Sequence, residues 1–300
     1  MSLLAILFSM VIERYVDAVA SIRNYTWTVR FSDWVKEKFS HSEFWNDTLG
    51  LVVILLVPFF ICAIIYDQLF DAMEPLAFLF ALAVLVYCIN PKRMYSLSRQ
   101  YLDAGENDDQ HSMQTYASEM MPDESFDDTR EMNSKVSIRM LTSTNNEVLA
   151  VFFWFVLLGP MGALLFRMSA ALFENTRGGY SNESEMENEA VDYTEFNSSA
   201  RMLYGILLWL PTQISILCFA IAGSFIDTLQ TWKQRLTSNY LDPDQSDETL
   251  YLCGFSSLQL DLEQKTFDLG AVNEVYALAF RTIIVWVTIL ALLILAGLIA

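Results

Sequence analysis

Ionisable and amide side chains stand beside long apolar runs in this 300-residue chain. A charge at the centre of a membrane helix costs about 2.5–3.5 kcal/mol on insertion scales, so it must face protein or water. The polar residues nearest the apolar runs, and therefore the candidate ligand-binding residues, are Glu13, Asn145, Asn146, Glu147, Arg167 and Arg201. Their groups suit ion pairing and hydrogen bonding. No nucleotide-binding loop or nucleophile elbow accompanies them, so no catalytic residue is assigned.

Gly159, Pro160 and Gly162 interrupt the apolar run that ends at Arg167. Proline removes a backbone hydrogen bond and bends a helix, and glycine lets a second backbone come close. Two interpretations stay open: a structural kink with tight helix packing, or a bend that opens a polar pocket beside Arg167. The arginine itself either extends to the lipid headgroups or lines a site.

The tract Asn145–Glu147 lies at the other end of the same run, roughly 30 Å from Arg167 along an ideal helix. One helix cannot unite them, so we expect this tract to belong to a site at the cytoplasmic face. Pro211 is a second predicted structural kink. After it, Thr212 and Gln213 offer hydrogen bonds to a neighbouring helix or to the carbonyls that the proline releases.

Apolar and acidic residues are segregated along the chain, which is 54% hydrophobic yet carries a formal net charge of −18. This combination is typical of a polytopic membrane protein. Runs close to the about 20 residues that cross a bilayer cover 49–66, 75–90, 148–166, 202–226 and 282–300. Residues 2–12 form a sixth candidate, which either crosses or lies in the interface. The predicted fold is all-α: one integral membrane domain over 1–300, with five or six transmembrane helices and cytoplasmic helical segments.

Lys and Arg near the ends of the runs predict the orientation. They place 21–48, an acidic segment at 91–147 and a segment at 227–281 in the cytoplasm. An acidic loop at 168–201 then lies on the other side, with 67–74 and Ala300. The acids of 91–147 lack calcium-loop spacing, which leaves a solvated helical hairpin or a loose cation or partner contact.

Metal and nucleic-acid binding are not expected. The chain has two histidines and no CxxC pair, so neither a metal centre nor a cofactor is predicted. Its acidic balance argues against nucleic acid, which rewards clustered Lys and Arg. The bilayer itself is the expected partner.

The runs FFWFVLLGPMGALLFR at 152–167 and SSARMLYGILLWLPTQISILCFAIAGSF at 198–225 resemble the AmpE family of bacterial inner-membrane proteins. Ile12-Glu13-Arg14 and the stretch around Trp34 are similar to that family too. The resemblance implies a multi-pass regulatory or signalling modulator tied to β-lactamase induction. Its partner gene product is an amidase that trims muropeptides recycled from the cell wall. A membrane or cytoplasmic protein partner in cell-wall recycling is therefore expected.

The same motifs are more distantly similar to the CobD/CbiB membrane enzymes, which attach aminopropanol to adenosylcobyric acid. In that comparison Thr142-Ser143 replaces a Glu-Asn pair and Asn146-Glu147 replaces Asp-Gly. Phe166-Arg167 keeps the arginine but loses a tyrosine hydroxyl, and Met168–Leu172 replaces an Asn-Thr-x-Asp run. A ligase that uses ATP needs acids to hold Mg²⁺, and most are missing. We therefore expect a modulator without its own catalysis. The alternatives are an amide-forming enzyme of CobD/CbiB type and a transporter, and the lack of an inverted repeat argues against the transporter.

Overall fold

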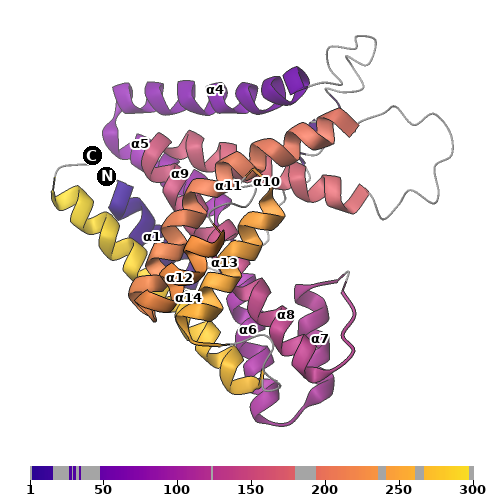
Figure 1. The fold of residues 1–300 in the computed structure, drawn as a ribbon. Coiled ribbons are helices and arrows are strands. Elements are labelled where there is room, and N and C mark those ends of the chain that lie inside the picture. The colour runs from indigo at the N-terminus through magenta and orange to yellow at the C-terminus, as the bar shows by residue number, and fades with distance from the viewer. Residues whose placement is uncertain are drawn as a thin grey trace. The chain divides into compact units, whose positions relative to one another are not determined.

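The computed structural model describes residues 2–15, 27, 28, 30, 31, 34, 48–122, 124–179, 194–235, 241–260 and 267–296. Throughout these ranges the regular structure is helical and contains no strand (Figure 1). The prediction of an all-α polytopic membrane protein is confirmed. The middle of the predicted acidic loop, at 180–193, lies outside the described residues.

Four helices in the described ranges are long and apolar enough to cross a membrane. They cover Gly50–Ala72, Thr129–Leu158, Phe196–Ala222 and Leu269–Leu293. A fifth span results if Glu74–Cys88 and Arg93–Glu106, which are bent by 43°, count as one. The N-terminal apolar helix Leu3–Glu13 is shorter than these, and about 20 residues are needed to cross the hydrocarbon core.

The helices group into two compact units. The first draws on 1–88, 151–209 and 240–243, and the second on 89–150, 210–239 and 244–300. The long helix α11 (Thr194–Ala222) contributes its first half to one unit and its second half to the other.

The first unit contains the helices α1 (Ser2–Tyr15), α4 (Thr48–Ala72), α5 (Glu74–Cys88), α9 (Ala150–Leu158) and α10 (Pro160–Gly179). Two of them, α4 and α5, are apolar and are joined by a short turn. Helix α5 packs against α1, α4 and α10, and α10 also packs against α4. Buried side chains such as Leu51, Met168 and Phe196 form one core cluster of this unit.

The second unit has a hydrophobic core of its own. It contains α6 (Pro91–Glu106), α7 (Gln110–Met120), α8 (Thr129–Thr144), the π-helix η2 (Asn145–Leu149), α12 (Phe225–Arg235), α13 (Pro243–Ser257) and α14 (Leu269–Leu295). Helix α6 contacts α7, α8 and α14, and α8 also contacts α7 and α14. Buried residues such as Tyr101, Val136 and Val272 belong to the core of this unit. The Asp128 side chain accepts from Glu131 N, and the Glu131 carboxylate accepts from Asp127 N, which fixes the start of α8.

The structure shifts one predicted span along the chain. Helices α8, η2 and α9 form a continuous span over Thr129–Leu158, whereas hydropathy predicted 148–166. The first part of this helix falls in the segment 91–147, because Thr142, Ser143 and Asn145 lower its hydropathy although the structure buries them. The span ends at Gly159, whose positive φ of 71° breaks the helix, and Pro160 begins α10. The last span likewise begins earlier than predicted, at Leu269, and 297–300 lie outside the described residues.

Candidate functional site

A single turn of π-helix lies in the middle of the Thr129–Leu158 span. It covers Asn145–Leu149, so the sequence Asn145-Asn146-Glu147 falls on the widened turn. π-Bulges of this kind are rare and often occur at functional sites, because the extra residue re-aims the side chains around it. The turn aims the Asn145 side chain into the protein, where it is fully buried.

Asn145 joins this turn to α11. Its amide nitrogen donates to Thr212 Oγ1 at 3.1 Å and to Asn146 Oδ1 at 2.9 Å. Its carbonyl oxygen accepts from Ser215 Oγ at 2.6 Å. Thr212 and Ser215 stand one turn apart on α11 and are both fully buried. A buried amide has to be satisfied in this way, since an orphaned one costs about 1–3 kcal/mol.

Asn146 and Glu147 face other partners. Asn146 Nδ2 donates to the carboxylate of Asp247 on α13, at 3.1 Å and 3.4 Å to the two oxygens. Glu147 lies 3.8 Å from the guanidinium of Arg139, and only 15% of its side chain is exposed. We call this set the η2 network: Arg139, Asn145, Asn146, Glu147, Thr212, Ser215 and Asp247. It connects three helices of the second unit.

Helices α12 and α13 extend this polar region. Trp232 Nε1 on α12 donates to Gln213 Oε1 at 2.7 Å, and Arg235 pairs with Glu248 of α13 at 2.9 Å. Gln213 therefore accepts a bond from a neighbouring helix instead of donating to a carbonyl that Pro211 releases. The carbonyl four residues before Pro211 belongs to Leu207, and the indole of Trp154 donates to it at 2.9 Å.

The other predicted residues lie in the first unit. Glu13 is 5% exposed and Arg167 is 6% exposed, so the Arg167 guanidinium is enclosed by protein and does not reach out toward headgroups. Arg201 pairs with Asp242 at 2.7 Å and lies 5.7 Å over the Phe173 ring. The structure thus brings Asn145, Asn146 and Glu147 into one network of the second unit. The other three candidates, Glu13, Arg167 and Arg201, lie in the first unit.

The predicted kink residues act in different ways. Gly159 and Pro160 separate two helices, as described above, and Pro211 lies inside α11. Gly162 permits a close approach, because a Cβ there would lie 2.3 Å from the Trp154 carbonyl oxygen. Gly205 does the same for the segment before α13, since a Cβ would lie 2.0 Å from the Leu241 carbonyl oxygen.

Sequence reasoning missed Ser215, Asp247 and Arg139 as parts of the network. Ser215 carried a signal: it follows Thr212 by three residues, and in a helix that spacing puts both polar groups on one face. Asp247 carried none, because it meets Asn146 from 101 residues away. In the described part of the chain, no group of three or more His, Cys, Asp or Glu residues could hold a metal ion.

Residues 1–300, the whole chain, match the sequence model of a family described as regulatory signalling modulator protein AmpE. The chain belongs to the AmpE family. This confirms the resemblance based on the runs at 152–167 and 198–225. Among curated proteins, the cobalamin biosynthesis protein CobD of Chromobacterium violaceum is 27% identical over 118 residues. That alignment covers 38% of this chain and 35% of CobD, so the match spans about a third of the relative's length. No solved structure matches the chain.

Proposed function

We propose that this AmpE-family protein is a bacterial inner-membrane modulator of β-lactamase induction in cell-wall recycling. It acts by binding a ligand or a protein partner, without catalysis of its own. Family membership over the whole chain supports the regulatory part of the proposal. The link to induction and recycling is what the family resemblance implies.

The bonds of Asn145 are the observation that carries the proposal. Both of its N–H groups and its carbonyl oxygen bond to protein atoms, so the residue acts as a joint between helices. A π-turn holds one residue more than an α-helical turn, so removing it rotates the rest of the helix. In this proposal the turn switches between a π-helical and an α-helical arrangement, as a signalling switch requires. Binding at either end of the span would then alter the contacts of η2 with α11 and α13.

Complementation of a deletion strain tests the proposal. The strain carries wild-type protein, Asn145→Ala or the matched control Gln114→Ala, which removes an exposed amide on α7. We expect altered β-lactamase activity after a sub-inhibitory β-lactam for Asn145→Ala at equal protein abundance, and wild-type induction for Gln114→Ala. Unchanged induction in the deletion strain itself would overturn the proposal.

An amide-forming enzyme of CobD type is the second candidate, favoured by the 27% identity to CobD over part of the chain. Against it, Asn146 stands where the resemblance expects an acid, and its side chain is engaged by Asp247. The assay uses purified protein under anaerobic conditions with ATP, aminopropanol and adenosylcobyric acid. Formation of ADP or of a new corrinoid above the level of a Glu147→Gln variant would establish catalysis. It would refute the proposal of a modulator without catalysis of its own.

A further inference from the structure

A small cavity in the first unit lies where α4 turns into α5. Its walls come from α1, α4, α5 and α9, and its volume is about 50 Å³. That is room for roughly three to five water-sized groups, since each needs about 10–15 Å³. Four aromatic side chains line it: Tyr66, Phe70, Phe78 and Phe155. Gly159 and Pro160, at the break between α9 and α10, also line it.

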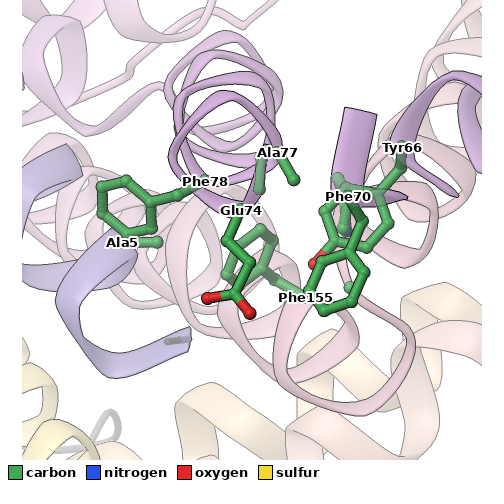
Figure 2. A pocket seen from close by; sticks show the side chains of 10 residues that line it. Ala5, Tyr66, Phe70, Glu74, Ala77, Phe78 and Phe155 are labelled. Carbon is green, nitrogen blue, oxygen red and sulfur yellow. The ribbon is translucent and has the colours of Figure 1, made fainter. Parts of the chain in front are cut away.

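One carboxylate, Glu74, lines this aromatic cavity. Figure 2 shows its carboxyl group between Phe78 on one side and Phe70 and Phe155 on the other. Within the described part of the chain, Glu74 has no hydrogen bond, ion pair or other protein partner. It is exposed, so the cavity is open to incoming ligands at the carboxylate. It lies in the first turn of α5.

The turn around Glu74 is negatively charged. Residues 67–74 include Asp67 and Asp71 but no lysine or arginine. The turn connects Gly50–Ala72, which is long enough to span a membrane, to the apolar helix α5, so it falls at the water interface of the hairpin. A cleft of one sign of charge with apolar walls concentrates the opposite charge. The cavity therefore attracts cations.

The walls select an organic cation over a metal ion. Calcium takes six to eight oxygen ligands and magnesium needs octahedral oxygen geometry, whereas this cavity offers one carboxylate among rings. An ammonium group is instead attracted to aromatic faces within about 6 Å of their centroids. Its N–H groups also donate charge-assisted hydrogen bonds to a carboxylate, which a trimethylammonium group cannot do.

We propose that this cavity binds the primary ammonium group of a small amine or of an aminolipid headgroup, with Glu74 as its counter-ion and the four rings as its walls. The inference goes beyond the proposed modulator function and does not depend on it. The small volume and the single carboxylate predict preference for ethanolamine over choline. Free amine and lipid headgroup share this chemistry, and the experiment separates them.

The experiment uses the purified full-length chain in a neutral detergent. Saturation-transfer NMR titrations with ethanolamine and with choline measure free amines. Native mass spectrometry from nanodiscs of mixed phosphatidylethanolamine, phosphatidylcholine and phosphatidylglycerol measures retained lipid. The variants are Glu74→Gln, which removes the charge at constant size, and Phe70→Leu, which removes one ring. Asp71→Asn removes a neighbouring charge that does not line the cavity and is the matched control.

Binding of ethanolamine, or retention of phosphatidylethanolamine over the other two lipids, is expected in wild type and Asp71→Asn. We expect at least about tenfold weaker binding in Glu74→Gln and a smaller loss in Phe70→Leu. Ethanolamine binding alone assigns a soluble amine, and lipid retention alone assigns a headgroup. No binding of either in wild type, or equal binding in Glu74→Gln, overturns the proposal. If Glu74→Gln fails to fold, unchanged binding in Phe70→Leu overturns the proposal instead.

Discussion

Ser215 of α11 donates a 2.6 Å hydrogen bond to the side-chain carbonyl of Asn145, although 70 residues separate them in sequence. Both side chains are fully buried, and both lie in helices long and apolar enough to span a membrane. With Thr212 on the same face of α11, this bond fixes which turn of α11 meets the π-helix. A change in the π-turn would therefore be felt directly by α11.

The first prediction concerns the strength of this bond. A double-mutant cycle with Asn145→Ala and Ser215→Ala should give a coupling free energy of about 0.6 kcal/mol, with about 1.7 kcal/mol as the upper bound. These are the mean and maximum for hydrogen bonds between membrane helices, where the unfolded state also finds partners. Each single variant should lower the free energy of unfolding, Asn145→Ala more than Ser215→Ala because it leaves Thr212 without its partner. Denaturant unfolding of the purified wild type, the two single variants and the double variant measures the four free energies of unfolding.

Thr288→Ala supplies the control cycle. The Thr288 hydroxyl is exposed and bonds to the Ile284 carbonyl of its own helix. Combined with Asn145→Ala it should show no coupling. Coupling of Asn145 to Ser215 no larger than in this control would mean that the bond does not form in the membrane protein.

Hydropathy was sufficient to predict the fold class and the approximate positions of the spans, since each apolar run overlaps one or more of the described helices. It failed at the ends of the span through Asn145. Polar side chains that are buried against other helices lower hydropathy as much as exposed ones do, and the break at Gly159 depends on a backbone angle. The kink predicted at Pro211 stays a prediction, since the proline lies inside the helix α11. The contact of Asn146 with Asp247 could not, because no local pattern encodes a contact across 101 residues.

The second prediction concerns Gly205, against which the Leu241 carbonyl packs. Alanine here should lower the free energy of unfolding by about 1–3 kcal/mol, the usual cost of overpacking, because the contact is with backbone. Gly270→Ala is the matched control, since the nearest atom to its Cβ would be a side-chain oxygen of Asp268, at 3.2 Å, and not a backbone atom. Thermal unfolding compares the two. A Gly205→Ala protein as stable as Gly270→Ala would show that the Leu241 carbonyl does not pack against Gly205 of α11.

The third prediction concerns sidedness. Charge in the loops assigned 168–201 and 227–281 to opposite sides of the membrane, yet Arg201 pairs with Asp242 at 2.7 Å. We expect Ser198→Cys and Leu241→Cys, both at exposed positions, to react with an impermeant maleimide from the same side of the membrane.

Inverted vesicles and intact spheroplasts distinguish the two sides in this labelling. The native cysteines Cys62, Cys88, Cys218 and Cys253 are all buried and give little background. Burial also raises the pKa of the Cys253 thiol to about 12, so little reactive thiolate forms there near neutral pH. Labelling of the two introduced cysteines from opposite sides would contradict the Arg201–Asp242 contact.

The fourth prediction concerns pH and Asp227, which follows the end of α11. The Ser224 hydroxyl donates to its carboxylate at 2.6 Å and the Gln259 amide at 2.9 Å, and these bonds lower the pKa of Asp227 below its usual 3.8. A lowered folded-state pKa adds stability above the unfolded value, and this stability is lost as the pH falls through the folded value. The difference in melting temperature between wild type and Asp227→Asn should therefore be constant above about pH 5. It should shrink as the pH falls below the usual pKa of the carboxyl group. Ser224→Ala removes the largest cause of the shift, so its pH-dependent stability should be smaller and its loss should be complete at a higher pH than in wild type. A melting difference that stays constant down to about pH 3 would show that these bonds do not hold the carboxylate in its ionised form.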